Sequence, residues 1–300
     1  MQLYELKVFL AVASEKSFSA AAERLLRTQP AVSLAVQRLE AAVGEKLLDR
    51  SGRDLVLTDT GKLVLEYARR FHNLHRDLEN ALGELRDKKA GRLVVGANES
   101  TTLYLLKHIQ EFRRLYPGVI VEIRRSLSSR LPAEIIRGDL ELGAISYHPG
   151  DQRLASSVIY VDHLSFVVSP RHRLAGRKEI SIQELGEENF IAHNVASPYR
   201  RVVLQTFQQH RVLLHMEVEM PTVETIRRMV QQDEGVAFLP KMCVEPDLQQ
   251  RTLCEIRVRE LTMDRNIRLV YPSRRRLSYA TRAFLDLLGV DPAEPEKQRE

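Results

Sequence analysis

The chain has 300 residues, of which 44% are hydrophobic, and a formal net charge of +5. This length is enough for two or three domains, each with a buried core. The small positive charge is compatible with nucleic-acid binding but carries little weight alone. Two cysteines, Cys243 and Cys254, exclude a disulfide framework and favour a reducing compartment. No segment reaches the roughly 20 apolar residues that span a bilayer, and the run at 8–13 is too short for a signal peptide. We therefore expect a cytoplasmic protein.

Residues 17–40 contain two short helical patterns on either side of a polar break. Ser17 is suited to cap the first helix and Thr28 the second, whose first turn accommodates Pro30. This arrangement predicts a helix-turn-helix, whose second helix enters the major groove and presents its N-terminal residues to the bases. The apolar spacing over residues 3–13 predicts a further helix that packs beneath the pair.

A wing is predicted after the second helix, which should end at Gly44. Segments 47–50 and 54–57 are predicted as two short strands joined by the loop 51–53. Gln29 is suited to bond adenine and Ser33 to bond a base or a phosphate, whereas the arginines are suited to hold phosphates. The expected DNA-binding residues are Arg27, Thr28, Gln29, Pro30, Ser33, Gln37, Arg38, Arg50 and Arg53.

A long helix is predicted from Thr58 or Asp59 to about Lys89. Its apolar residues recur at alternating intervals of three and four, which is the pattern of a coiled-coil seam. The most economical partner for such a helix is a second copy of the chain. The expected dimerisation residues are Val64, Tyr67, Phe71, Leu74, Leu78, Ala81 and Leu85. Residues 88–91 are predicted to form a hinge.

From residue 92 onward, strands and helices alternate, which predicts a parallel sheet with crossover helices. The first half is expected to have strands at 92–96, 119–124 and 142–146 and helices at 101–116 and 131–137. The second half, from about residue 161, is expected to have strands near 165–169, 190–192 and 216–220 and helices near 199–209 and 223–232. A strand at 268–271 and a helix at 277–288 are expected to return to the first half. Two such halves leave a ligand cleft between them.

The order of these parts resembles the LysR-type transcriptional regulators. Matching motifs lie at 3–13, 17–22, 29–33, 38–40 and 57–61, and further ones at 138–142 (Gly-Asp-Leu-Glu-Leu) and 235–240 (Gly-Val-Ala-Phe-Leu-Pro). The resemblance covers about residues 1–290. It implies an α/β protein with an all-α-type winged helix-turn-helix domain, a long linker helix and a two-lobed, periplasmic-binding-protein-like α/β effector domain.

The resemblance also implies boundaries and partners. The expected parts are a DNA-binding domain at 1–58, a linker at 59–89, an effector domain at 92–290 and a flexible tail at 291–300. Lobe one should comprise 92–161 and 267–290, and lobe two 162–266. The expected partners are double-stranded DNA, a small-molecule effector, RNA polymerase and further copies of the chain, as a dimer or as a tetramer built from two dimers.

Three predicted helix starts face the cleft, and their N–H groups and hydroxyls favour a small anionic effector. The expected effector-binding residues are Asn98, Ser100, Thr101, Thr102, Ser128, Ser197 and Thr222. Alternatively, each hydroxyl only caps its own helix, and a zwitterionic or amine-bearing ligand fits better if Glu99 and Glu224 point inward. The pairs at 124–125 and 200–201 are also arginines, but paired charges are more often surface residues.

The leading hypothesis is a DNA-binding transcription regulator whose promoter binding responds to an effector in the C-terminal cleft. The alternative is a cytoplasmic small-molecule-binding protein or an enzyme with an accessory DNA-binding domain. We expect no enzyme, because nucleophile-elbow, phosphate-loop, zinc-protease and dinucleotide motifs are absent from the sequence. We expect no cofactor and no metal, since His72 and His75 lack further ligands at suitable spacing.

Overall fold

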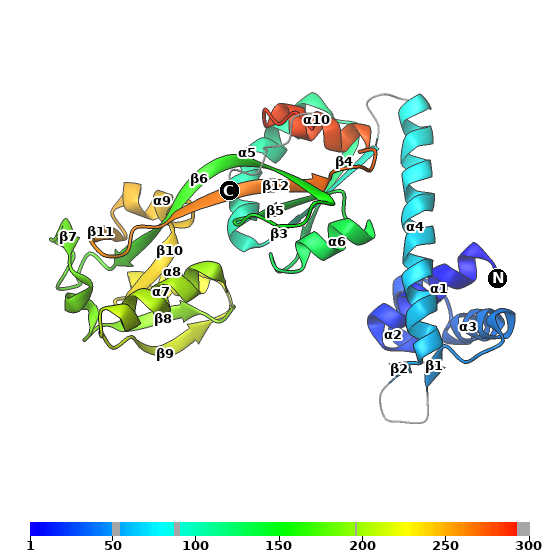
Figure 1. Cartoon of the computed structure of the whole chain (residues 1–300), viewed down its shortest axis with the longest axis horizontal. Helices are drawn as coiled ribbons and strands as arrows, with labels where there is room; N and C mark the ends of the chain where they lie inside the picture. Colours follow the sequence, from blue (N-terminus) through cyan, green and yellow to red (C-terminus); the bar gives the residue numbers. More distant parts are fainter. Residues whose placement is uncertain (50–54, 87–90, 196, 293–300) are drawn as a thin grey trace. The chain divides into compact units, whose positions relative to one another are not determined.

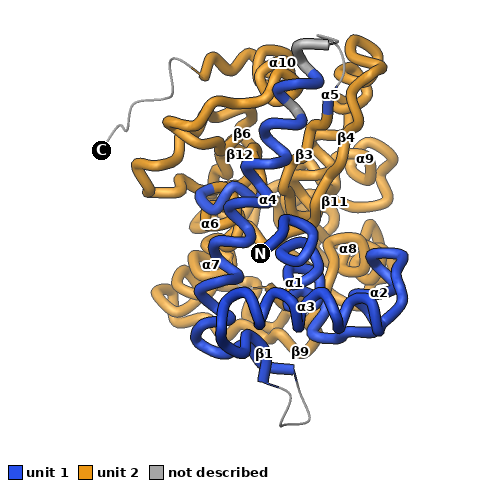
Figure 2. Tube along the Cα trace, turned by 90° about the vertical axis from the view of Figure 1, so that its right-hand side faces the viewer, with its two compact units in different colours: residues 1–91, 136–139 blue, residues 92–135, 140–300 orange. Residues whose placement is uncertain are grey.

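The computed structural model describes residues 1–49, 55–86, 91–195 and 197–292. They form two compact units, residues 1–91 with 136–139 and residues 92–135 with 140–300 (Figure 2). The wing residues Arg50 and Arg53, the hinge at 88–90 and the tail from 293 lie outside the described residues. Among the described helices, none is long and apolar enough to cross a membrane.

The first unit is built on a core of three helices. Its elements are α1 (Leu3–Glu15), α2 (Phe18–Leu25), α3 (Gln29–Val43), β1 (Leu48–Asp49), β2 (Val56–Leu57) and α4 (Asp59–Arg86) (Figure 1). Fully buried Phe9, Val32, Val36 and Leu39 join the helices, and β1 pairs with β2 in antiparallel register. The predicted helices and the pairing of the two short strands are therefore present, whereas the predicted loop at 51–53 lies outside the described residues.

The predicted helix ends are mostly confirmed. The Ser17 hydroxyl accepts from the Ala20 N–H at 3.2 Å and caps α2, and Thr58 Oγ1 accepts from the Gly61 N–H at 2.9 Å at the start of α4. Gly44 ends α3 with a φ of 86°, a left-handed conformation that suits glycine. The predicted side-chain cap at Thr28 is wrong, because Thr28 stands at the N-cap position without a side-chain capping hydrogen bond.

Lobe one of the second unit is a small α/β layer. It contains β3 (Gly91–Ala97), α5 (Glu99–Leu115), β4 (Val119–Arg125), α6 (Leu131–Arg137) and β5 (Leu142–Ile145). The C-terminal helix α10 (Tyr279–Leu287) packs into the same core, where Phe284 meets Phe112 edge to face at 5.3 Å. Glu141 anchors the start of α10 by accepting hydrogen bonds from Ser278 and Thr281.

Two long strands run through both lobes. β12 (Asp264–Pro272) pairs in antiparallel register with residues 154–163 of β6 (Leu154–Val168), and the two strands lie side by side in Figure 1. The end of β6 pairs with β10 and β11 of lobe two. The sheet order is β4-β3-β5-β12-β6-β11-β7, with β3 and β5 parallel but β12 antiparallel to β5. The expectation of a wholly parallel sheet is therefore wrong. The strand predicted near 165–169 is only the end of β6, whose middle carries exposed Tyr160 and Val161 and breaks the apolar pattern.

Lobe two contains the remaining elements. They are β7 (Glu179–Ile180), the short 3₁₀ helix at Ile182–Leu185, β8 (Asn189–His193), α7 (Pro198–Gln209), β9 (His215–Met220), α8 (Val223–Gln231), β10 (Ala237–Pro240), α9 (Lys241–Gln250) and β11 (Cys254–Val258). Its mostly aliphatic core includes an aromatic cluster, in which Phe190 stacks on Phe238 at 5.6 Å. Before β10, Gly235 has a φ of 154°, and a Cβ there would lie 2.6 Å from the Asn189 carbonyl oxygen.

Candidate functional site

The exposed face of α3 is the candidate DNA-binding surface. Gln29, Ser33 and Gln37 follow each other at intervals of four and therefore share one side of the helix. Gln29 and Gln37 are exposed and Ser33 is half-buried, whereas the core residues on the opposite side of α3 are buried. The other predicted DNA-binding residues that the structure describes are all exposed. They are Arg27, Thr28, Pro30 and Arg38.

Glu40 connects α3 to the wing. Its side chain is 4% exposed, and Oε1 accepts from the backbone N–H groups of Leu47 at 2.9 Å and Leu48 at 3.4 Å. Lys46 Nζ lies 3.0 Å from Oε2. Burial alone raises the pKa of Glu40, but the hydrogen bonds from Leu47, Lys46 and Leu48 outweigh it and hold the pKa below its usual value. No local sequence pattern indicates this contact.

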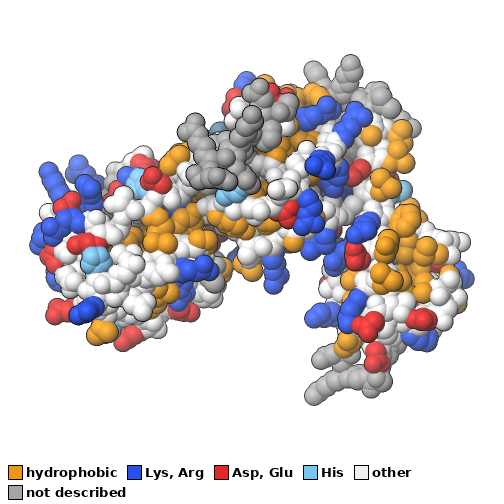
Figure 3. Space-filling view, in the orientation of Figure 1, with side chains coloured by type: hydrophobic (Ala, Val, Ile, Leu, Met, Phe, Trp, Pro, Cys, Tyr) orange, Lys and Arg blue, Asp and Glu red, His pale blue; other side chains and the backbone are white. Residues whose placement is uncertain are grey.

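The predicted seam of α4 lies on the surface of the single chain. Tyr67, Phe71, Leu74 and Leu78 are each at least half exposed, and apolar side chains are visible along α4 in Figure 3. Val64 packs partly against the first unit's core, Ala81 is exposed, and the Leu85 side chain lies outside the description. Leu82, which is not among the predicted seam residues, is also exposed, at 45%. An apolar stripe of this size on one helix favours a partner surface.

The second unit contains a cavity of about 890 Å³ between its lobes. Lobe one contributes the start of α5, the end of β4 and the loop that follows it. Lobe two contributes β8, the start of α7 and part of β10, including Phe190 and Phe238. The cavity therefore combines polar groups at two helix starts with an aromatic and aliphatic wall, which is a common composition for a small-molecule site.

The predicted effector-binding residues divide into three groups. Asn98, Ser100, Ser128 and Ser197 line the larger cavity. Thr102 and Thr222 line a smaller cavity of about 530 Å³. Thr101 is fully buried and its hydroxyl donates to the Ala144 carbonyl at 3.3 Å, so the structure places it behind the wall.

Several of these polar side chains also cap their own helices. Asn98 Oδ1 accepts from the Thr101 N–H, Ser197 Oγ from the Arg200 N–H and Thr222 Oγ1 from the Thr225 N–H. The capping alternative from the sequence is therefore observed at all three helix starts. Asn98 Oδ1 also accepts from Ser100 Oγ at 3.1 Å, and Thr222 Oγ1 lies 2.9 Å from Thr225 Oγ1, so these two oxygens are already used within their own helix starts.

Arginines are the main feature of the larger cavity that sequence reasoning underestimated. The arginine pairs were expected on the surface, and Arg124, Arg125 and Arg201 are exposed. Arg125 and Arg201 nevertheless also line the cavity, as does half-buried Arg200. Arg130 and Arg265 line it as well. Arg265 lies between Asp264 and Asn266 at the polar start of β12, so nothing local marked it or Arg130.

Two further side chains of lobe two complete this region. His193 Nδ1 accepts from the Val195 N–H at 3.1 Å. Burial, together with nearby Arg125 and Arg200, lowers the pKa of His193 despite Glu99. Tyr199 donates its hydroxyl to the Ser146 carbonyl, and this bond joins lobe two to lobe one.

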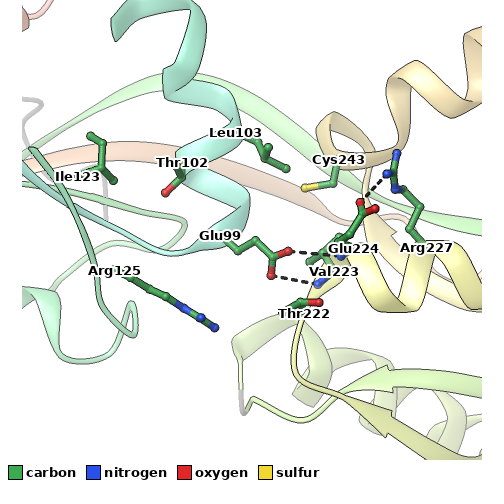
Figure 4. Close-up of a pocket in the computed structure, with 10 residues that line it drawn as sticks. All are labelled: Glu99, Thr102, Leu103, Ile123, Arg125, Thr222, Val223, Glu224, Arg227 and Cys243. Atoms are coloured by element: carbon green, nitrogen blue, oxygen red, sulfur yellow. Dashed lines mark hydrogen bonds and ion pairs between the residues drawn. The ribbon is translucent and has the colours of Figure 1, made fainter.

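The smaller cavity adjoins the start of α8 (Figure 4). There Glu99 of α5 reaches α8, with Oε2 3.0 Å from the Val223 nitrogen and Oε1 3.3 Å from the Glu224 nitrogen. The expectation of free N–H groups at this helix start is therefore wrong. Glu224 is paired with Arg227 and Arg228, and these bonds outweigh burial to lower its pKa.

The two cysteines show no sign of a paired redox centre. Cys243 is 6% exposed, and burial raises the pKa of its thiol to about 12. Both cysteines are free. Among the described residues, no group of three or more His, Cys, Asp or Glu is placed to hold a metal ion.

Comparison with known proteins decides the family. Residues 3–62 match the model of the bacterial regulatory helix-turn-helix protein, lysR family, and residues 86–290 match the model of the LysR substrate binding domain. The chain belongs to the LysR family. It is a transcriptional regulator with a DNA-binding and an effector-binding domain, not an enzyme, which confirms the predicted family, fold class and general function.

Two of the following relatives of this LysR-type regulator align with nearly its whole length, and the third with its effector-binding part. The probable RuBisCO transcriptional regulator of Cyanophora paradoxa is 32% identical and aligns with 99% of this chain and 95% of the relative. Full-length CbnR complexed with its target DNA has a TM-score of 0.71 at 18% identity, covering 96% of this chain and 99% of CbnR. The CcmR regulatory domain of Synechocystis PCC6803, in complex with 2-PG, has a TM-score of 0.60 at 22% identity, covering 66% of this chain and 95% of that domain.

Proposed function

We propose that this LysR-type regulator binds promoter DNA through α3 and changes its DNA affinity when an anionic effector fills the larger cavity. The observation that carries the proposal is the distribution of guanidinium groups. Arg125 and Arg130 come from lobe one, Arg200 and Arg201 from lobe two, and Arg265 from the crossing strand β12. An anion among them contacts both lobes at once.

The charges around the cavity favour an anion over the zwitterionic alternative. Its described lining residues include five arginines and two glutamates, Glu99 and Glu134. Both glutamates have partners, because Glu99 accepts from α8 and Glu134 accepts from the Ser126 hydroxyl at 3.0 Å. Arg200 is paired with Glu219 and Arg265 with Asp162, so the positive charge that attracts carboxylate or phosphate groups comes from Arg125, Arg130 and Arg201.

The proposed mechanism is a population shift. An effector that binds residues of both lobes stabilises one arrangement of the lobes relative to others. The free energy available to shift this equilibrium equals the difference between the effector's binding free energies for the two arrangements. The 2-PG complex of CcmR supports a small ligand in this fold, and 2-PG is therefore one of the anions to test.

For DNA, we propose that Gln29 and Ser33 contact bases while Arg27 and Arg38 hold phosphates. Gln37 shares their face of α3, and Thr28 and Pro30 lie at its N-terminal end. Arg50 and Arg53 remain proposed backbone contacts of the wing. Because several relatives are named as RuBisCO regulators, the upstream regions of RuBisCO genes and of the chain's own gene are the first DNA to test.

We further propose that the α4 stripe pairs two copies of the chain and that two such dimers form a tetramer. RNA polymerase is the proposed partner of the promoter-bound form. We place the protein in the cytoplasm, because the promoter DNA on which it acts is there.

The effector proposal is tested by thermal-shift titration of the full chain with small carboxylates and phosphates, 2-PG among them. A native-state ligand at about 100 times its Kd stabilises by about 2.7 kcal/mol. We expect Arg130→Ala and Arg201→Ala to lose the shift, whereas the exposed α5 residue Arg113, changed to Ala, keeps it. A shift from amines or uncharged ligands alone, or one that survives both cavity variants, contradicts the proposal.

A further inference from the structure

The start of α8 is completed by a residue from the other lobe. The first N–H groups of a helix have no acceptor within the helix and need partners from outside. Here Thr222 Oγ1 accepts from the Thr225 N–H at 3.2 Å, and Ile226 begins the helical hydrogen bonds by donating to the Thr222 carbonyl. The remaining two, at Val223 and Glu224, donate to the carboxylate of Glu99 in α5 (Figure 4).

No acidic side chain of α8 itself accepts these two hydrogen bonds. The carboxylate of Glu224, which lies in the first turn of α8, is drawn away by Arg227 and Arg228. Glu99 is separated from Val223 by 124 positions, so the contact exists only when the two lobes lie close together. A charged acceptor makes shorter and stronger hydrogen bonds than a neutral one, and the helix dipole adds to the attraction.

The contact also lies between the two cavities. Glu99, Arg125 and Val223 line both the larger and the smaller cavity. In Figure 4, Arg125 extends from β4 toward the same opening. A carboxylate that belongs to the protein therefore already occupies the place where an effector carboxylate would otherwise meet the N-terminus of α8.

We propose that Glu99 is an internal anion that fixes the spacing of the two lobes and reserves the α8 N-terminus, so that the anionic group of an effector is directed to the arginines. It is a positioning residue, acting through α8. The first part, the link between the lobes, depends only on the geometry of Glu99. The second part, the direction of the effector, rests on the proposed function of the larger cavity.

The first experiment measures hydrogen exchange in the full chain without effector, in the peptide that contains Val223 and Glu224. We expect Glu99→Ala to speed exchange of these amides by about tenfold or more, since each loses a bond to a charged acceptor. Glu99→Gln, which keeps one acceptor oxygen but no charge, should lie between Ala and the wild type. Glu111→Ala, an exposed glutamate of the same helix, is the matched control and should leave exchange unchanged.

Chemical rescue provides the sharper test. Sodium formate supplies a free carboxylate small enough to replace the one that Glu99→Ala removes. We expect formate to restore slow exchange and to raise the Tm of Glu99→Ala in a saturable manner, with no such effect on the wild type or on Glu111→Ala. If Glu99→Ala does not fold, the exchange measurement without formate is made with Glu99→Gln, whose amide fills the space that formate would need.

Unchanged exchange at Val223 and Glu224 in both variants overturns the proposal, as does a formate effect of equal size in the wild type. The outcome is separable from that of the proposed function. Faster exchange with formate rescue, but no stabilisation by any anion in the wild type, leaves Glu99 as the link and refutes the anionic effector. Unchanged exchange at Val223 and Glu224, together with anion binding that needs Arg130 and Arg201, keeps the anionic effector and refutes the Glu99 link.

Discussion

Asp162 and Arg265 form an ion pair that is almost entirely removed from water. Their side chains are 0% and 5% exposed, and Arg265 Nη1 lies 2.8 Å from Asp162 Oδ2. The two residues stand opposite each other on β6 and β12, the strands that run through both lobes. Arg265 also donates to Ser100 Oγ at 3.3 Å and lies over the Tyr199 ring at 4.8 Å. One buried guanidinium thus contacts α5 of lobe one and α7 of lobe two.

Removing the negative charge of this ion pair should lower the free energy of unfolding. Burial raises the pKa of Asp162, although Arg265 opposes the rise. Asp162→Asn leaves the Arg265 charge buried and uncompensated, which typically costs about 3–5 kcal/mol. We expect that loss in urea unfolding of the full chain followed by circular dichroism. The control, Glu179→Gln, affects an exposed pair with Arg257 and should cost less than about 1 kcal/mol; equal losses in the two variants contradict the assignment.

Glu40 should stabilise the wing in a pH-dependent manner. Its folded pKa lies below the unfolded value near 4.5, so its contribution is fully present above that pH and is lost as pH falls through the folded pKa. At neutral pH, Glu40→Gln should cost about 1–3 kcal/mol, and the difference from the wild type should shrink in acid. The measurement is urea-dependent hydrogen exchange in α3 and β1, with exposed Glu23→Gln as control. A difference that does not change with pH disagrees with this linkage.

Arg38 and Gln29 should affect DNA binding in different ways. Arg38→Ala should weaken binding to all sequences and reduce the salt slope by about one, because one phosphate contact is lost. Gln29→Ala should cost about 1–3 kcal/mol at a preferred site and little at other sites. Fluorescence anisotropy at several salt concentrations checks both, with Arg113→Ala as the charge-matched control. If Gln29→Ala weakens all sequences equally, Gln29 does not read a base.

The α4 stripe should hold copies of the chain together. Leu74 and Leu78 are 67% and 56% exposed, so a charge at either position costs little in the single chain and much in a buried interface. We expect Leu74→Asp and Leu78→Asp to lower the mass found by light scattering. Glu79→Asp introduces the same side chain at a position outside the predicted seam and should keep the mass of the wild type.

The two cysteines should differ in reactivity. The thiolate is the reactive form, and at about pH 8 a thiol with a pKa near 12 is ionised in only about one molecule in ten thousand. Iodoacetamide should therefore modify half-buried Cys254 in the native chain and Cys243 only after unfolding. Mass spectrometry of tryptic peptides over a time course provides the measurement, and equal rates for the two thiols exclude this account.

The features that can be inferred from the sequence are local. The caps at Ser17 and Gly44 and the apolar spacing of α3 and α4 act over a few residues, so they identify the helix-turn-helix and the linker without any tertiary information. The same holds for most of the short helices and strands of the effector domain, and the motifs at 138–142 and 235–240 added the family's two-lobed fold.

The tertiary structure alone decided how charges are distributed in the effector domain. Asp162 meets Arg265 across 103 positions and Glu99 meets α8 across 124, and no local pattern indicates either contact. Two adjacent arginines in a sequence are usually solvent-exposed side chains. Only the packing of lobe two against lobe one makes Arg200 and Arg201 part of a cavity lining. The length of β6 was underestimated for the same reason. The exposed middle of β6 has no apolar alternation, and only the pairing with β12 makes it one strand.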